Sequence, residues 1–382
     1  MDFQLNEEQS LLENSISRFV QEKFSTLENI DKARENICGF SDADWQQIVE
    51  MGLTMMPFSA EDGGLGYGME ETGIAMSALG RGLVGAPYLN NIVIPGAVLR
   101  EGGDKQQKQR LLAPMMEGKE RIAFAHGEAT TFNDPFHIET TAKKDGSHYI
   151  LNGTKVVVPY AQGANYYLVS ARTSGSKLSR EGLSLFIVPA DTAGINAEHF
   201  RSADGGRASQ LSFKDVKIDA PNIIGKENDA GSIIERAFQE GMVALMAEAA
   251  GIMDALLVLT VDYLKQRHQF GVAIGTFQAL QHKAVDMMIA GEQARSMSYY
   301  AMMMLNNSDP EERRAALSAA KAQINKSARF VGQTSVQLHG GIGMTMEYIG
   351  AHYFRRLTMI EALFGSTDVH IENVVHYGKL VA

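Results

Sequence analysis

The hydrophobic period of the chain changes twice, and these two changes limit the possible fold more than any other feature. Up to about residue 120, apolar residues recur at the three- and four-residue spacing of amphipathic helices, as at Leu12 and Ile16. Short apolar runs separated by turn residues follow, which is typical of strands. Long helical runs then return. The sequence therefore predicts an α+β protein with three domains, at residues 1–120, 121–228 and 229–382.

Local signals mark where several elements begin or turn. Asn6, with a glutamine three residues later, has the pattern of a helix capping box. In the central part, Asp145-Gly146 and Asn152-Gly153 predict two hairpin turns, because both dipeptides tolerate positive φ. Strands at this spacing, without helices between them, predict an antiparallel sandwich or barrel.

The last third of the chain predicts a helical bundle. Its long helical segments are expected at residues 233–266, 277–306 and 310–338. The twenty methionines of the chain mostly fill helix interfaces in this prediction. Residues 242–260 are nearly all apolar, but Glu248 and Asp254 interrupt them, so a buried core helix is predicted rather than a membrane span.

Composition excludes several classes of function. Lys and Arg total 35 against 45 Asp and Glu, a formal charge of −10, which argues against nucleic-acid binding. The single cysteine, Cys38, excludes an internal disulfide framework, and no histidines pair at metal-ligand spacing, so no metal site is expected. The first residues lack the pattern of a secretory signal. We expect a cytoplasmic protein that binds neither nucleic acid nor membrane.

Two segments carry side chains suited to ligand binding. Arg267 at a helix end can clamp a pyrophosphate, and Phe270 can lie against a flat ring. From the residues alone, an Arg that interacts with the helix dipole and a capping Gly271 explain this segment equally well. The second segment starts at Gln337. Its glycines allow close approach of a ligand, although a plain helix stop explains them nearly as well.

Taken together, these segments resemble the acyl-CoA dehydrogenase family over essentially the whole chain. The stretches that carry the resemblance are PFSAEDGGLG (57–66), LNGTK (151–155), LSFKDVKI (211–218), YLKQRHQFGVAIGTFQALQ (263–281) and QLHGGIGMTMEY (337–348). Small subunits of pimeloyl-CoA dehydrogenase look especially similar. The resemblance implies an N-terminal all-α domain, a central antiparallel β-barrel domain and a C-terminal four-helix bundle, usually in a tetramer with FAD.

The resemblance also implies a reaction and a set of cofactor-binding residues. In the family, a carboxylate takes the α-proton of an acyl-CoA while the flavin accepts hydride from Cβ, and an electron-transfer flavoprotein is the expected acceptor. Residues of the two segments match family positions that reach the FAD of a neighbouring subunit. They are Arg267, Gln269, Phe270, Gln278, Gln337, Gly340 and Gly341.

The family's catalytic glutamate has no match here. Nine residues after Arg355, where the family places it, stands Phe364, which cannot accept a proton. Some members place the glutamate on the long first bundle helix, at the position of Gly241. Glu240 is its neighbour, but one residue turns a helix by about 100°. Glu248 fits an ordinary hydrogen-bonded core carboxylate better than a base. The sequence therefore identifies no catalytic residue.

The segment that cradles the flavin in the family is altered as well. A Thr-Glu-Pro-x-Ala-Gly-Ser-Asp loop is replaced by residues 127–134, with Phe132 in place of a glycine. A following Trp-Ile-Thr is replaced by Val157, Val158 and Pro159, and proline supplies neither hydroxyl nor N–H. The residues for the chain's own flavin are thus lost, while those directed at a neighbour's flavin are kept.

Three hypotheses follow. The first is a subunit of a heteromeric FAD-dependent acyl-CoA dehydrogenase, an α2β2 heterotetramer, that supports the FAD of its partner. The second is an active homotetrameric dehydrogenase or oxidase whose base is relocated to Glu240 or Glu248. The third is a non-catalytic acyl-CoA-binding or scaffold protein. The sequence does not choose between dicarboxylic, fatty and steroid side-chain acyl-CoA substrates of β-oxidation, and fold analogy alone cannot decide.

Overall fold

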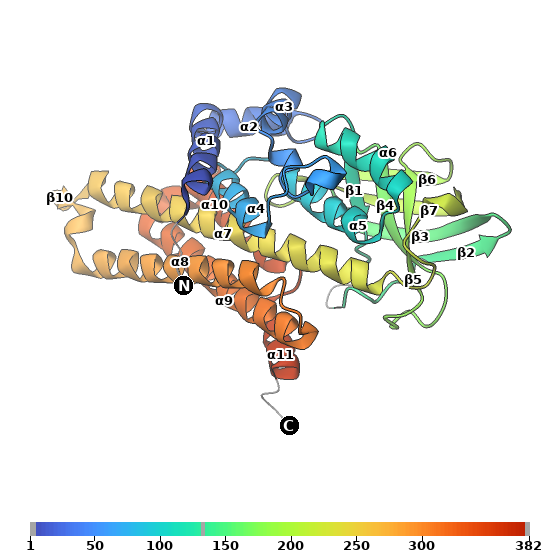
Figure 1. The fold of residues 1–382 in the computed structure, drawn as a ribbon. Helices are drawn as coiled ribbons and strands as arrows, with labels where there is room; N and C mark the ends of the chain where they lie inside the picture. Colours follow the sequence, from blue (N-terminus) through green and yellow to red (C-terminus); the bar gives the residue numbers. More distant parts are fainter. Residues whose placement is uncertain (1–4, 131–133, 379–382) are drawn as a thin grey trace. The chain divides into compact units, whose positions relative to one another are not determined.

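The computed structural model describes residues 5–130 and 134–378 (Figure 1). The chain forms two compact units, each assembled from separate stretches of sequence. The first, called the helical unit here, comprises Met1–Lys32, Met69–Val84 and Met242–Ala382. The second, called the β unit, comprises Ala33–Gly68 and Gly85–Gly241. The three domain boundaries expected from the sequence stay a prediction.

The helical unit is built mainly from helices that bury one apolar face. Its helices are α1 (Glu7–Lys23), α4 (Met69–Arg81), α8 (Gln278–Met304), α9 (Pro310–His339), α10 (Ile349–Ala362) and α11 (Thr367–Tyr377), and it also contains the short hairpin of β9 (His268–Gln269) and β10 (Val272–Ala273). Two helices are divided between the units: α2 (Leu27–Glu35), and α7 (Gly231–Gln266), which belongs to the helical unit from Met242 onward. The predicted capping box at Asn6 is confirmed, because its side chain accepts from the Gln9 amide and Gln9 bonds back to the Asn6 amide.

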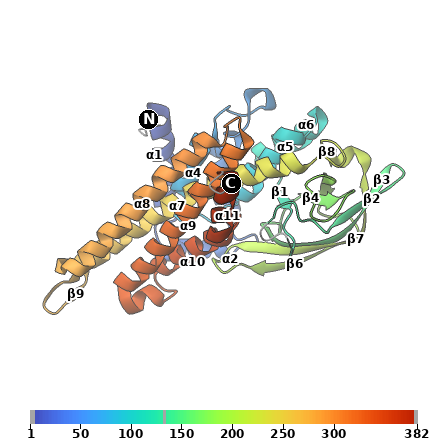
Figure 2. The same ribbon diagram turned by 90° about the horizontal axis from the view of Figure 1, so that it is seen from below.

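α8 and α9 lie side by side and antiparallel in both views (Figures 1 and 2). Small side chains on the buried face of α9, such as Ala320 and Ala328, permit close approach of its neighbours. α7 is long and apolar enough to cross a membrane by length and composition, but 67% of its most apolar window is buried in the protein. The two acidic residues within 242–260 hold ion pairs, Glu248 with Arg356 at 2.6 Å and Asp254 with Arg295 at 2.6 Å. These features fit the predicted core helix.

The β unit contains one eight-stranded sheet and flanking helices. Its helices are α3 (Asp42–Glu50), α5 (Ile94–Gly102) and α6 (Lys105–Met116), and its strands are β1 (Ile122–Ala125), β2 (Thr141–Asp145), β3 (His148–Pro159), β4 (Tyr166–Arg172), β5 (Leu183–Pro189), β6 (Ile195–Arg201), β7 (Arg207–Asp219) and β8 (Ile223–Ile224). The strand order is β6-β7-β3-β2-β4-β5-β8, with β1 beside β4. Most pairs are antiparallel as predicted, whereas β4 runs parallel to β1 and β2.

One predicted hairpin turn is confirmed and the other is wrong. Asp145 and Gly146 connect the antiparallel strands β2 and β3. Asn152 and Gly153 instead lie inside β3, where its pairing with β7 shifts register. Gly153 has φ +150°, and a Cβ there would lie 2.5 Å from the Thr140 hydroxyl oxygen. The Asn-Gly pair therefore lies within a continuous strand, opposite a bulge in β7, because β7 advances three residues here while β3 advances two.

Candidate functional site

The first set of predicted cofactor residues lies where α7 ends. The amide of Arg267 donates to the Tyr263 carbonyl at 2.8 Å, and the β9–β10 hairpin follows. Phe270 stands at the hairpin tip with φ +55°, and its side chain is 90% exposed. Gln269 and Gln278, the latter at the first position of α8, are also exposed. The structure thus presents these side chains on the surface of the helical unit.

The second set lies where α9 ends. Gln337 is exposed in the last turn, and Gly340 follows the helix with φ +65°. A Cβ added to Gly340 or Gly341 would meet nothing within 4 Å, so the backbone is open to close approach. The two sets are joined by a hydrogen bond, because the Tyr263 hydroxyl donates to the His339 carbonyl at 3.2 Å. The segments 263–281 and 337–348, far apart in sequence, therefore meet in the fold.

The altered flavin-cradle residues lie in the β unit. Phe132 is outside the residues that the structure describes, so its side chain is not placed. Val157 stands at φ +50° and is 48% exposed, at a second register shift between β3 and β7. Val158 is buried, and Pro159 ends β3. None of these three side chains offers a hydrogen bond to a polar ring.

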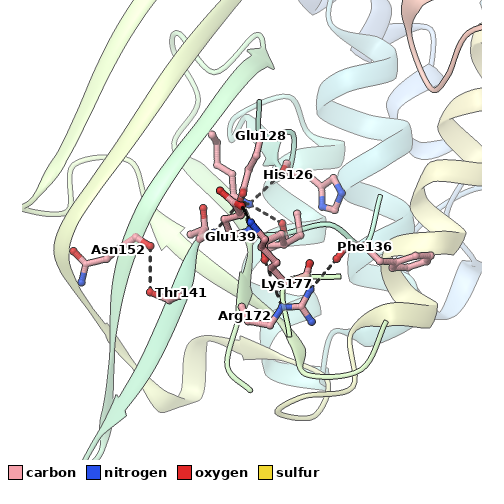
Figure 3. Close-up of polar contacts among 12 residues, drawn as sticks. His126, Glu128, Phe136, Glu139, Thr141, Asn152, Arg172 and Lys177 are labelled. Carbon is pink, nitrogen blue, oxygen red and sulfur yellow. Dashed lines mark hydrogen bonds and ion pairs between the residues drawn. The ribbon is translucent and has the colours of Figure 1, made fainter. Parts of the chain in front are cut away.

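A buried polar cluster anchors this part of the β unit (Figure 3). The Lys155 ammonium donates to Glu128 Oε1 at 2.6 Å, to the His126 carbonyl at 3.1 Å and to Ser170 Oγ at 3.1 Å. Glu128 also accepts the backbone amide of Glu139 at 2.7 Å. Lys155 is fully buried and Glu128 nearly so. The ion pair thus ties the loop after β1 to strand β3.

Burial is the largest single influence on the pKa of Lys155, Glu128 and His126. It lowers the pKa of Lys155 to about 8, although Glu128 opposes the shift. Burial alone raises the pKa of Glu128, but the charge and hydrogen bond of Lys155 outweigh it and hold that pKa below its ordinary value. For His126, burial and the nearby Lys155 charge lower the pKa to about 3, so the imidazole is neutral at physiological pH.

His126 was not among the predicted site residues, and its surroundings are unusual. Its ring stacks on Phe124 with 5.1 Å between ring centroids and meets the edge of Phe238 at 4.8 Å. Both ring nitrogens are buried, and the backbone carbonyl of Pro135 interacts only weakly with the imidazole. Strand alternation explains its direction, because Ala123 and Ala125 face the sheet core and leave Phe124 and His126 on the other face.

The two candidate relocated bases are both engaged in ion pairs. Glu240, with a side chain only 4% exposed, bonds Arg100 through one oxygen and Arg236 through the other at 2.8 Å. Glu248 forms a two-pronged pair with Arg356 at 2.6 and 2.8 Å, as expected of a hydrogen-bonded core carboxylate. Either carboxylate would have to break an ion pair before it accepted a substrate proton.

The position at which the resemblance implies the family's glutamate is a tight turn between α10 and α11. Phe364 occupies it with φ +61°, followed by Gly365 with φ +109°. His370 of α11 donates from Nε2 to the Phe364 carbonyl at 3.0 Å. A Cβ on Gly365 would lie 2.9 Å from that nitrogen, so the imidazole fixes the turn. The turn therefore presents an aromatic side chain where the resemblance implies a base.

Comparison with known proteins covers nearly the whole chain. Sequence profiles of the acyl-CoA dehydrogenase N-terminal, middle and C-terminal domains match residues 6–119, 123–216 and 230–377. The mitochondrial short-chain specific acyl-CoA dehydrogenase of Sus scrofa is 30% identical over 349 residues, which cover 90% of this chain and 83% of that protein. Acryloyl-CoA reductase (NADH) of Anaerotignum propionicum is 29% identical over 378 residues, covering 97% and 94%.

Solved structures agree with this comparison. The FAD complex of PigA superposes with a TM-score of 0.90 and 26% identity over the full length of both chains. A steroid acyl-CoA dehydrogenase variant, Tcur3481-Tcur3483, gives a TM-score of 0.87 with 25% identity over 98% of each chain. The predicted fold class is confirmed. The finer resemblance is not, since the relatives named here are a short-chain dehydrogenase and a reductase rather than a pimeloyl-CoA dehydrogenase subunit.

Proposed function

Because this chain belongs to the acyl-CoA dehydrogenase family, we propose that it is a subunit of a heteromeric enzyme that supports the FAD of its partner. One observation carries the proposal, namely the contrast between the two sets of cofactor residues. The helical unit presents Arg267 and Gln337 on its surface and leaves open space beside the backbone of Gly340. The β unit has Val157 and Pro159 where hydrogen-bonding groups are expected.

The residues of the helical unit fit one end of a dinucleotide. A guanidinium such as that of Arg267 is suited to a pyrophosphate, and an exposed ring such as Phe270 is suited to a flat heterocycle. Gly340 and Gly341 leave room for close backbone approach. When bound, FAD supplies the hydride acceptor for acyl-CoA oxidation. The family's cofactor is thus compatible with the exposed set, although Val157 and Pro159 do not fit it.

The carboxylates of this chain support a division of labour. Phe364 cannot take an α-proton, and Glu240 and Glu248 are held by arginines. We therefore assign the base to the partner subunit. The alternative of an active homotetramer requires one of these ion pairs to open during turnover.

The surface of α8 supports an assembled state. Apolar side chains cover its buried face, and a second apolar group lies exposed on and beside it: Val285, Met288, Ile289, Tyr300 and Met303 of α8 with Phe330 of α9. A helix that is apolar on two faces is usually covered on both. A groove of about 360 Å³ between α8 and α9 is lined by Ile289 and Phe330 and also by the charged residues Asp286 and Lys326. We propose that a related subunit covers this surface.

The substrate proposed is an acyl-CoA thioester, with an electron-transfer flavoprotein as acceptor. The family relationship supports both. Tcur3481-Tcur3483 carries a two-part name and is described as a steroid enzyme, which favours a two-subunit assembly and a steroid side chain among the candidate substrates. A medium-chain dicarboxylic acyl-CoA is the second candidate, from the resemblance to pimeloyl-CoA dehydrogenase subunits.

The test is to co-express the chain with the acyl-CoA dehydrogenase encoded nearest to it and to replace one side chain at a time. Arg267→Ala is expected to lower the FAD content of the purified complex severalfold, because a charge-assisted contact is lost. Arg18→Ala, at an exposed helix position whose guanidinium pairs with Glu22 of the same helix, is the matched control. An unchanged FAD content in the Arg267 variant would overturn the proposal.

A further inference from the structure

The ends of α7 and α9 are joined by a cluster of three aromatic side chains. The hydroxyl of Tyr263, one turn before Arg267, donates to the carbonyl of His339 at 3.2 Å. The His339 ring lies between two tyrosines, with centroids 4.5 Å from Tyr263 and 4.9 Å from Tyr348. His339 is the last residue of α9 and is only 3% exposed. The cluster therefore connects the two segments that carry the exposed cofactor residues.

The hydrogen bonds of His339 fix its tautomer. Nδ1 lies 2.8 Å from the Ser335 carbonyl, which can only accept, so Nδ1 carries the hydrogen. Nε2 is then the acceptor for the Tyr348 hydroxyl at 2.9 Å. Burial lowers the pKa of His339 and raises that of Tyr348 to about 12, which keeps both groups neutral. Nδ1 also lies 3.4 Å from the Ser335 hydroxyl oxygen, so a flip of the ring would break the contacts of both nitrogens.

The residues after His339 depend on it for their position. Gly340 begins the 3-10 turn η6 (Gly340–Met344) with φ +65° and has open space beside it. A Cβ on Gly343 would lie 3.0 Å from the His339 Cβ, so the end of the turn packs on the same residue. The turn is consequently held from one side, through the carbonyl and side chain of His339.

We propose that Tyr263, His339 and Tyr348 are positioning residues for cofactor binding. They set the distance between the Arg267 guanidinium and the open backbone of Gly340, the two groups that would hold a dinucleotide pyrophosphate together. This inference rests on the proposed function. A positioning role differs from ordinary core packing in what it predicts. If the cluster only packed, its substitution would lower stability but leave the affinity for the cofactor unchanged.

The test measures FAD affinity in the mixed complex and hydrogen exchange in the chain alone. Tyr263→Phe removes one hydroxyl and is expected to weaken FAD binding about fivefold to tenfold, since one partly buried hydrogen bond is lost. Tyr353→Phe is the matched control, because the buried Tyr353 hydroxyl also donates to a carbonyl, that of Arg81 at 2.5 Å. Both variants should lose similar thermal stability, but only Tyr263→Phe should lose FAD affinity.

A second pair of variants separates packing from hydrogen bonding. His339→Leu should weaken FAD binding at least as much as Tyr263→Phe, and His339→Gln, which can still accept from Tyr348, should recover part of the affinity. In the chain alone, His339→Leu should speed exchange of the amides at 340–343 about tenfold.

The outcomes are distinct. A wild-type complex that holds no FAD would overturn the proposed function and this inference with it. Two results would overturn only the positioning role. One is equal FAD affinity in the wild-type and Tyr263→Phe complexes, and the other is an unchanged rate of amide exchange at 340–343 in His339→Leu. An equal loss of affinity in Tyr353→Phe would do the same.

Discussion

Replacing Lys155 by methionine tests how strongly the buried cluster of the β unit depends on charge balance. The Lys155 and Glu128 side chains are 0% and 5% exposed and lie 2.6 Å apart. Lys155→Met leaves the Glu128 carboxylate buried with backbone amides as its partners, and it removes the donor from the His126 carbonyl. Removal of one partner of a buried pair typically costs about 3–5 kcal/mol, and we expect a loss of that size.

The same substitution at an exposed pair provides the control. Lys177 and Glu139 also lie 2.6 Å apart, in the same view (Figure 3), but their side chains are 60% and 44% exposed. Lys177→Met should cost less than about 1 kcal/mol, because water screens the pair. Urea unfolding followed by circular dichroism measures both free energies.

A double variant tests the cause of the loss. Glu128→Gln removes the charge that Lys155→Met leaves behind, and the glutamine oxygen can still accept the backbone amides. The double variant should therefore be more stable than Lys155→Met alone. If Lys155→Met costs no more than Lys177→Met, or if the two losses simply add in the double variant, the reasoning about the buried charge is refuted.

Three further predictions concern the helical unit. Burial lowers the pKa of Lys321 from 10.5 to about 7, so between these pH values the unfolded chain binds one proton more than the folded chain, and the free energy of unfolding should rise with pH. Urea unfolding of Lys321→Met should not show this rise, and an equal rise in both proteins would contradict the prediction. Phe364→Glu should let the chain exchange the α-proton of a bound acyl-CoA with deuterated water, whereas Phe364→Gln and wild type should not, as proton NMR would show. Ile289→Asp, at a side chain 48% exposed, should lower the assembly mass measured by light scattering without loss of helix content, and an unchanged mass would exclude that surface.

Local signals predicted the elements of the fold better than their pairing. The capping box at Asn6 and the limits of α8 and α9 follow from residues close in sequence, and the structure confirms them to within two residues. The prediction of a hairpin turn at Asn152-Gly153 was wrong because the conformation of this dipeptide depends on β7. The Asn152 side chain accepts from the amide of Asp215, 63 residues away, and the strand continues past the dipeptide.

The exposed part of the candidate site was accessible from sequence, but the buried part was missed. Arg267 and Gln337 stand at helix ends that their own motifs mark. Lys155 was overlooked as a site residue, although it follows Tyr149 and Leu151 at even spacing, which places it on the same inward face of a strand. Its partner Glu128 could not be identified without knowledge of the loop after β1. The Tyr263–His339 contact likewise joins residues 76 positions apart.

The central claim is that this chain holds a partner's FAD and leaves its own flavin position unused. The most direct test is to count FAD per chain, from the flavin absorbance at about 450 nm, in the wild-type protein purified alone and in complex with its partner. We expect no flavin in the chain alone and about one flavin for every two chains in the complex. One flavin per chain in the protein purified alone would contradict it.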